Sequence, residues 1–361
     1  MRALHQFVPT FEPGAIGGHV LELQRLATDE LGVESDVFAQ HLRWPARNDG
    51  VRPFTDYGRR VRARPGDVLL YHMAVGSDVA GFLRDRREPL VVDHHNITPP
   101  SYFARWEPAA AHGCSWGRGQ LQELAARAEL GVGDSAFNED ELRQAGYRQT
   151  ATAPILLDLD RLTADVDDGS LERLRAAGDG GGATWLFVGR VAPHKCQHDV
   201  VKALAAYRRM YDPAARLHLV SGSSAPAYSE AIERMAAELG MADAVVLTGA
   251  VSPGELEAHY RAADVFVCLS EHEGFCIPLL EAMAHRVPVV AYAATAVPGT
   301  VGGGALLLPA KGPGTVAAAV HRVLTDRPLR DSLVAAGTRR LADFTLPATR
   351  ACWRDTLAPL T

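Results

Sequence analysis

Lysine is scarce in this chain of 361 residues, which has a formal net charge of −6. Of its 37 lysines and arginines, three are lysines: Lys195, Lys202 and Lys311. Binding to a nucleic-acid backbone needs an extended cationic surface, whereas the basic clusters here are short and local. The composition therefore argues against nucleic acid as a partner.

Cysteines are also few and scattered. There are five, an odd number, and none falls in a C-x-x-C spacing. Neither a disulfide framework nor a zinc site is indicated by this pattern. We therefore expect a reducing compartment, no metal site and no cofactor.

Long hydrophobic runs are missing as well. No window approaches the ~18 apolar residues of a membrane span, and the first residues have the pattern of a strand rather than of a leader. We expect a cytoplasmic protein. Two arginine clusters, 59–64 and 84–87, could make peripheral contact with a membrane, although solvated faces explain them better.

What the sequence does have is a regular alternation of short aliphatic runs with amphipathic stretches, in each half of the chain. Such alternation predicts parallel sheets covered by helices on both faces. The length fits two domains. We predict an α/β protein with two facing, doubly wound, Rossmann-like domains, divided at residues 157 and 158, with a hinge near 155–182 and ligands in the cleft between the domains.

The strongest motif follows the aliphatic run 265–269 and reads SEHEGFCIPLLEAMA over residues 270–284. Gly274 suits a tight turn, and Pro278 suits the first turn of a helix. The amides of Gly274, Phe275 and Cys276 would then be free to donate to phosphate or hydroxyl oxygens.

Glu273 and Glu281 belong to the same motif. A carboxylate can accept two hydrogen bonds from a vicinal diol, so one could hold sugar hydroxyls and the other a ribose. The alternative is that Glu273 caps a helix and Glu281 is a solvated helix residue.

A second motif, LFVGRVAPHK over residues 186–195, ends a strand with a glycine and adds two cations, Arg190 and Lys195. A departing nucleoside diphosphate gains negative charge as its bond to the sugar breaks. Fixed cations stabilise that transition state more than the ground state. The alternative is that both are loop charges without function.

Weaker signals come from the first half. Gly17 and Gly18 lie between the first strand and first helix, where a phosphate loop would be, but they form no G-x-G-x-x-G fingerprint and a tight turn is an equal alternative. Histidines at strand ends could contact a donor sugar or its phosphate, and we favour His95 over His94 and His72. The ordinary role for Ser135 is a helix cap.

Together these residues resemble the retaining GT-B glycosyltransferases of family four, the glycosyl transferases group 1, over nearly the whole chain. The resemblance implies that Glu281 binds the ribose, Glu273 and the following amides bind the donor sugar, and Arg190 with Lys195 binds the diphosphate. It further implies that Gly18 approaches the diphosphate and that His95 is the active-site histidine of the first domain.

The resemblance also implies the activity: a hexose moves from a nucleoside-diphosphate sugar to a hydroxyl acceptor with retention of configuration and without a metal. The acceptor attacks from the face that the diphosphate leaves. Residues 1–157, completed by a returning helix at 341–361, would bind the acceptor, and residues 158–340 the donor. A D-x-D spacing at Asp158 and Asp160, known from metal-dependent sugar transferases, is interpreted as chance.

Cys196 and Cys276 depart from the family pattern, which has glycine or another small residue at these places. Both flank the expected phosphate site, so we expect thiols whose alkylation slows activity and which nucleoside diphosphate protects.

Other enzyme and non-enzyme functions remain open from sequence. A nucleotide-sugar epimerase or an inverting transferase would share this architecture, and a non-catalytic nucleotide-sugar sensor would share its site. A nicotinamide-dependent oxidoreductase is disfavoured because the dinucleotide fingerprint is missing. The acceptor, the linkage, the sugar and the base of the donor, and the oligomeric state are not encoded in these motifs.

Overall fold

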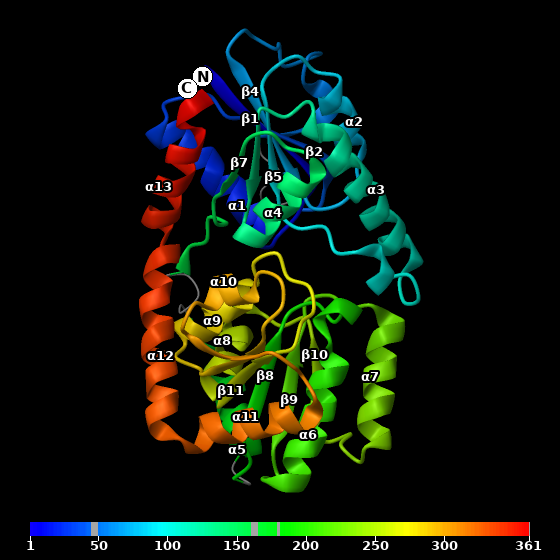
Figure 1. Cartoon of the computed structure of the whole chain (residues 1–361), viewed down its shortest axis with the longest axis vertical. Helices are drawn as coiled ribbons and strands as arrows, with labels where there is room; N and C mark the ends of the chain where they lie inside the picture. The colour runs from blue at the N-terminus through cyan, green and yellow to red at the C-terminus, as the bar shows by residue number, and fades with distance from the viewer. Residues whose placement is uncertain (45–49, 160–164, 179–180, 361) are drawn as a thin grey trace. The chain divides into compact units, whose positions relative to one another are not determined.

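The computed structural model describes residues 1–44, 50–159, 165–178 and 181–360. The chain divides into two compact units, each with a parallel sheet (Figure 1). The first unit comprises Met1–Leu157 and Phe344–Thr361, and the second comprises Asp158–Asp343. The division after residue 157 is where the sequence pattern places it. Of the D-x-D pair, Asp160 lies outside the described residues, as do parts of the expected hinge.

The first unit is built on a seven-stranded sheet in the order β3-β2-β1-β4-β5-β6-β7, and the strand pairs are parallel. This order is the doubly wound one, with its topological switch between β1 and β4. The strands are β1 (Ala3–Phe11), β2 (Val37–Leu42), β3 (Val51–Pro53), β4 (Asp67–Met73), β5 (Leu90–His94), β6 (Leu130–Gly133) and β7 (Thr150–Thr152).

Helices connect these strands, as parallel strands require. They are α1 (Ala15–Arg25), α2 (Asp78–Arg84), α3 (Pro108–Ala125), α4 (Ala136–Ala145) and the final helix α13 (Leu346–Leu357), with a π-helical turn η1 (Leu26–Glu30) after α1 and 3-10 turns η3 (Phe54–Asp56), η4 (Pro100–Tyr102) and η8 (Ala358–Leu360).

The final helix, red in Figure 1, completes the first unit rather than the second. Trp353 is fully buried there, and its indole nitrogen donates to the Pro154 carbonyl at 2.9 Å. Arg350 donates to Glu22 of α1 at 2.8 Å. The hydrophobic core of this unit therefore includes residues from both ends of the chain.

The second unit repeats the scheme with a six-stranded sheet in the order β10-β9-β8-β11-β12-β13. Its strands are β8 (Thr184–Val188), β9 (Arg216–Val220), β10 (Val245–Gly249), β11 (Val265–Cys268), β12 (Val289–Tyr292) and β13 (Ala305–Leu308). Its helices are α5 (Asp168–Gly178), α6 (Gln197–Met210), α7 (Pro226–Glu238), α8 (Pro253–Ala262), α9 (Ile277–Ala284), α10 (Val297–Val301), α11 (Pro313–Thr325) and α12 (Arg327–Leu341), and a 3-10 turn η6 (Pro193–Lys195) follows β8.

The two central strands of this sheet, β8 and β11, are neighbours, paired at Trp185 with Val265 and at Leu186 with Phe266. They form the topological switch of the second unit. Segments that leave their carboxyl ends in an open sheet therefore lie together, at the usual place for a ligand. Both strong motifs of the sequence begin there.

Several elements were not predicted from sequence. β13 follows Gly302–Gly304, a pattern typical of a loop, and β7 has only three residues. α3 begins at Pro108, and its glycines are packing residues: a Cβ on Gly117 would lie 2.6 Å from the Gly76 nitrogen. Close backbone packing, rather than helix propensity, selects glycine there.

Candidate nucleotide-sugar site

Lys195 and Glu273 are brought together from two loops of the second unit. Lys195 ends the turn η6 after β8, Glu273 follows β11, and Lys195 Nζ lies 2.5 Å from Glu273 Oε2. Glu273 is only 4% exposed. Burial works to lower the pKa of Lys195, but the charges around it, Glu273 foremost, raise that pKa above the usual value. The pair is therefore a buried carboxylate held by a partly buried ammonium, whose side chain is 20% exposed, and not two loose loop charges.

Hydrogen bonds fix the backbone around this pair. The Glu271 amide donates to the His194 carbonyl at 2.9 Å, which joins the two loops directly. The Glu273 amide donates to Thr295 Oγ1 at 2.9 Å, and Thr300 Oγ1 donates to the Phe275 carbonyl at 2.6 Å. Because these polar groups are already in place, binding a ligand here needs little reorganisation.

Arg190 lies on the same loop as Lys195. Its carbonyl accepts from Gln197 Nε2 at 2.8 Å, which ties the start of the loop to the first turn of α6. The structure therefore places all of Arg190, Lys195 and Glu273 at the carboxyl ends of β8 and β11.

The tight turn before α9 has its left-handed residue at Cys276, with φ 71°, and not at Gly274 as the sequence suggests. Cys196, which precedes α6, has φ 54°. A side chain disfavours this conformation, which explains why glycine fits both places in the family that the sequence resembles. Pro278 lies in the first turn of α9, as predicted.

The two thiols differ in environment. Cys196 is 1% exposed, and burial raises its pKa to about 11. Hydrogen bonding with Cys268, and then burial, raises the pKa of Cys276 as well. Neither is an activated thiolate. Alkylation at this site is therefore expected to be slow and confined to Cys276, which is partly exposed.

Glu281 lies inside α9 and accepts a hydrogen bond of 2.6 Å from the Tyr260 hydroxyl. Burial raises the pKa of Glu281 above the ordinary value for a carboxyl. The alternative interpretation of Glu281 as a solvated helix residue is therefore wrong. Glu273 does not cap α9 either, since the N-cap residue is Cys276. Tyr260 is a site residue that the sequence analysis missed, because a helical tyrosine gives no pattern of its own.

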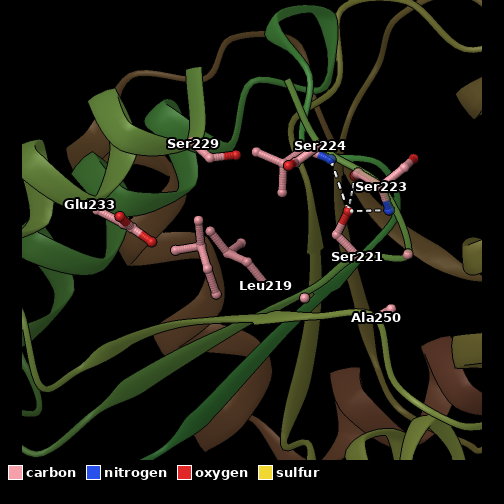
Figure 2. A pocket seen from close by; sticks show the side chains of 11 residues that line it. Leu219, Ser221, Ser223, Ser224, Ser229, Glu233 and Ala250 are labelled. Carbon is pink, nitrogen blue, oxygen red and sulfur yellow. Dashed lines mark hydrogen bonds between the residues drawn. The ribbon is translucent and has the colours of Figure 1, made fainter. Parts of the chain in front are cut away.

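A pocket of about 310 Å³ opens over the neighbouring strands β9 and β10 (Figure 2). Leu219 forms its floor, and serines of the loop after β9 line one side. Ser229 and Glu233 face it from α7, and the Ser229 hydroxyl is buried without a hydrogen-bond partner among the described residues. The pocket combines an apolar floor with polar walls, as small-molecule sites in general do.

In the first unit, Gly17 and Gly18 lie within the first turn of α1 rather than in the loop before it. A Cβ on Gly17 would lie 2.1 Å from the Glu12 carbonyl oxygen, whereas a Cβ on Gly18 would meet none of the residues that the structure describes within 4 Å. Gly17 therefore serves close packing, and Gly18 leaves an open surface at the start of a helix. Only Gly18 has the surroundings expected of a ligand contact.

The histidines at the strand ends have separate environments. His94 Nε2 lies 3.1 Å from Glu141, while His95 joins a buried group with His72 and Asp93. Burial lowers the pKa of His72 to about 4. Burial also acts to lower the pKa of His95, but Asp134 and Asp93 raise it well above the usual value. Whether His95 contacts a donor stays a prediction.

Ser135 Oγ accepts from the Asn138 amide at 3.2 Å, so its ordinary interpretation as the cap of α4 is confirmed.

Comparison with known proteins decides the family of the second unit. Residues 175–340 match the model of the glycosyl transferases group 1. They form a glycosyl transferases group 1 domain. Within the residues that the structure describes, no helix is both long and apolar enough to cross a membrane.

Among relatives of the chain, D-inositol 3-phosphate glycosyltransferase of Geodermatophilus obscurus is 34% identical over 292 residues, covering 76% of this chain and 62% of the relative. The GDP-mannose-dependent alpha-(1-6)-phosphatidylinositol monomannoside mannosyltransferase of Mycobacterium tuberculosis is 36% identical over 185 residues, covering 48% and 45%. The chain thus spans less than two thirds of the length of these two relatives.

Solved structures extend the likeness to both units. HepE of Anabaena in complex with UDP-glucose is 20% identical, with a TM-score of 0.73 and 99% coverage of each chain. Sucrose-phosphate synthase of Thermosynechococcus elongatus is 20% identical, with a TM-score of 0.75 and 99% coverage of each chain. The fold is GT-B, as the sequence predicts.

Proposed function

We propose that this protein is a retaining, metal-independent glycosyltransferase that moves a hexose from a nucleoside-diphosphate donor to an acceptor hydroxyl. The observation that carries the proposal is the Lys195–Glu273 pair, held at the switch point of a group 1 domain with Glu281 nearby in sequence on α9. Relatives named as glycosyltransferases and a fold neighbour that binds UDP-glucose support it.

In this proposal the donor lies across the carboxyl ends of the second sheet. Arg190, Lys195 and the amides that begin α9 bind the diphosphate, and Glu281 accepts from the ribose hydroxyls. Glu273 and the amide of Gly274 bind the sugar, with Phe275 and Cys276 continuing the turn. The base occupies the pocket between α7 and the loop after β9.

The chemistry follows from these placements. As the bond between the sugar and the phosphate breaks, negative charge grows on the phosphate that leaves, and Lys195 with Arg190 stabilises that charge. The acceptor hydroxyl attacks from the same face, and the leaving phosphate oxygen takes its proton. Glu273 orients the sugar and is not a nucleophile, so the reaction needs no covalent intermediate on this chain.

The first unit would supply the acceptor side, with Gly18 near the diphosphate and His95 near the sugar, and the protein would work in the cytoplasm. The named relatives act on inositol phosphate and on a phosphatidylinositol mannoside. A polyol carrying a phosphate is therefore the acceptor class to test first.

The decisive experiment has two stages. A thermal-shift screen of nucleoside diphosphates and their sugars identifies the donor, since a ligand at ~100 times its dissociation constant adds about 2.7 kcal/mol. That donor is then incubated with a panel of hydroxyl acceptors. Acceptor-dependent release of nucleoside diphosphate and an NMR spectrum with the donor's anomeric configuration are expected, with and without a chelator.

The same assay separates the alternatives. Epimerised sugar without acceptor would indicate an epimerase, and binding without turnover would indicate a sensor. A product with inverted anomeric configuration would refute only the retaining mechanism and would leave the proposed transferase activity standing. Lys195→Met should lower kcat/KM by at least about a hundredfold, as loss of one donor to a developing oxyanion does. Lys202→Met, on the surface of α6, is the matched control and should leave it unchanged.

A further inference from the structure

Tyr260 is a buried residue of α8 whose hydroxyl reaches the carboxylate of Glu281 on α9. Its side chain belongs to a residue that is 1% exposed, and the hydroxyl donates to Glu281 Oε2 at 2.6 Å. Such a short distance is typical of a strong bond to a charged acceptor. Burial, and then the negative charge of Glu281, raises the pKa of Tyr260 well above its usual value. The hydroxyl therefore keeps its proton and is the donor in this bond.

The ring of Tyr260 is held in place by aromatic neighbours. The His285 imidazole is stacked on it, with ring centroids 4.7 Å apart and planes at 12°. Phe266 of β11 is also nearly parallel to it, with centroids 6.2 Å apart and planes at 21°. Stacked rings of this kind add to the energy of burial. The place of the hydroxyl is thus set by packing as well as by its hydrogen bond.

His285, at the end of α9, is itself fixed by polar contacts. Its Nδ1 lies 2.7 Å from the main-chain carbonyl of Glu281 and donates to it, since a carbonyl can only accept. Its Nε2 lies 2.5 Å from Oε2 of Glu257, which is 4% exposed. Arg261 Nε donates to the other oxygen of Glu257 at 2.6 Å. The ring against which Tyr260 packs therefore has little freedom to move.

The two oxygens of Glu281 differ in their surroundings. Oε2 accepts from Tyr260, whereas for Oε1 the described residues offer no hydrogen-bond partner, and Glu281 is partly exposed. A glutamate side chain has three rotatable bonds, and ordering them when a ligand binds costs conformational entropy. A carboxylate already held by one oxygen avoids much of that cost and presents its second oxygen in a fixed direction.

We propose that Tyr260 is a positioning residue for the nucleoside-diphosphate donor: its hydroxyl holds Glu281 by Oε2, so that Oε1 is left to accept from the ribose. The inference rests on the ribose-binding role proposed above for Glu281. Tyr260 touches no substrate in this arrangement and acts through Glu281. It has a second effect, because a bond donated to the ionised carboxylate works against the burial that raises the pKa of Glu281.

This second effect gives donor binding a pH dependence. Among the described residues, the titratable groups that act on Glu281 are Tyr260 from α8 and His285 from α9 itself, and both favour the ionised carboxylate. The ribose binds to that ionised form, so donor affinity should fall as pH falls through the pKa of Glu281. Without the Tyr260 hydroxyl this pKa is higher, and the fall should begin at a higher pH.

The test is calorimetric titration of GDP and of UDP into the full chain between pH 5 and 8. Tyr260→Phe removes one oxygen and keeps the ring. It should weaken the tighter-binding nucleotide about tenfold at pH 7 and move the midpoint of the loss at acid pH upward by roughly one unit. Tyr57→Phe is the matched control, because it removes a buried hydroxyl that donates to Glu88 at 3.3 Å in the first unit. It should change neither quantity.

A double-mutant cycle shows whether Tyr260 acts through Glu281. In a Glu281→Ala background, which has no carboxylate to hold, Tyr260→Phe should change the affinity by less than about twofold. A tyrosine with a merely structural role would weaken binding equally in both backgrounds and leave the pH midpoint in place, and this result would overturn the inference. Melting curves without nucleotide measure any effect on folding separately.

The same titrations separate this inference from the proposed function. Weaker binding in Glu281→Ala with unchanged binding in Tyr260→Phe would overturn the positioning role alone. Unchanged binding in Glu281→Ala, or a wild type that binds neither nucleotide, would overturn the ribose-binding role of Glu281 and the positioning role with it.

Discussion

Gly17 and Gly18 are neighbours in α1, but a methyl group meets different surroundings at each. At Gly17 it would lie 2.1 Å from the Glu12 carbonyl oxygen, and at Gly18 it would meet no atom of the described part of the chain within 4 Å. Gly17→Ala should therefore lower the free energy of unfolding by about 1–3 kcal/mol. Gly18→Ala should keep or raise it, since alanine favours helix.

If Gly18 approaches the diphosphate, donor binding should be harmed more by Gly18→Ala than by Gly17→Ala, the opposite of the effect on stability. Gly18→Ala should then weaken the donor at least about tenfold by calorimetry, because a methyl group would displace a phosphate oxygen. Urea unfolding of the two variants measures their free energies of unfolding and so checks the predicted effects on stability. Equal stability of both would contradict the packing assigned to Gly17.

Glu281 couples the stability of its unit to pH. Burial raises its pKa above the ordinary 4.5, so the folded state binds the proton more tightly than the unfolded state. The stability that this bound proton adds to the folded state is fully present below the ordinary pKa, and it is lost as pH rises through the raised pKa of the folded state. Glu281→Gln removes the cost of burying a charged carboxylate at pH 7. Its side-chain oxygen can still accept the hydrogen bond from Tyr260, so at pH 7 the variant should melt at or above the temperature of the wild type.

The same variant should bind the donor less well, because a neutral amide is a poorer acceptor for a ribose diol than a carboxylate. Thermal melts from pH 4 to 8, with and without nucleoside diphosphate, measure both effects. A variant that melts lower at pH 7 and binds the donor normally would show that Glu281 is structural.

Glu233 lies at the edge of the pocket in which we propose that the base of the donor binds, so its carboxylate could accept hydrogen bonds from that base (Figure 2). Guanine presents an N–H and an amine side by side, which one carboxylate can accept together, whereas uracil has one N–H flanked by two carbonyls. We expect GDP to bind more tightly than UDP, and Glu233→Leu to reduce that preference by about 1–3 kcal/mol. Titration of both nucleotides into both proteins checks this, and a wild type that prefers UDP would refute it.

At the scale of elements, the loops after β8 and β11 are joined by the ion pair of Lys195 with the buried Glu273 carboxylate, beside the backbone hydrogen bond from Glu271 to His194. Removing a single partner leaves the other charge buried, which typically costs about 3–5 kcal/mol. Lys195→Met and Glu273→Gln should therefore each destabilise the second unit, and the double variant should cost less than their sum.

The coupling energy from this double-mutant cycle should exceed about 1 kcal/mol. The exposed pair Arg322 and Asp326, 3.5 Å apart in the same unit, is the control and should show less than about 0.5 kcal/mol with Arg322→Met and Asp326→Asn. Urea titrations of all variants provide the numbers. Additive effects at Lys195 and Glu273 would mean that the loops are held by their backbone hydrogen bonds instead.

The sequence predicts elements well where periodicity and length agree, as for β11 and α9. It fails where backbone packing decides, as for α3, and where a strand is short, as for β7. Motif residues near one another in sequence, such as Glu273 and Glu281, could be placed in advance. Tyr260 and the cluster around Asp93 could not, because their partners come from distant segments and meet only when the sheet forms.

At the scale of the whole molecule, α13 belongs to the first unit, and Trp353 is its buried anchor. Trp353→Ala should lower the stability of that unit by about 3–5 kcal/mol, since it removes a large core side chain and the hydrogen bond to Pro154. The second unit, with its own core, should keep its stability.

Calorimetry with nucleoside diphosphate separates the two units, because the ligand, bound mainly by the second unit, should raise the transition of the second more than that of the first. Arg354→Ala is the control, since Arg354 is exposed and its contact with Glu30 is 3.4 Å long. It should change either transition little. A Trp353 variant whose two transitions fall equally would show that the units unfold together.

The return of the last helix has a consequence for synthesis. While the ribosome is still translating residues 158–343, the first sheet lacks the tryptophan that closes its core, although the second unit can already form once its own strands emerge. The order of maturation is thus the reverse of the order of translation. The apolar side chains around Leu4 and Leu156 stay exposed until α13 has been translated and packs on them. We expect a chaperone that binds the nascent chain to bind there.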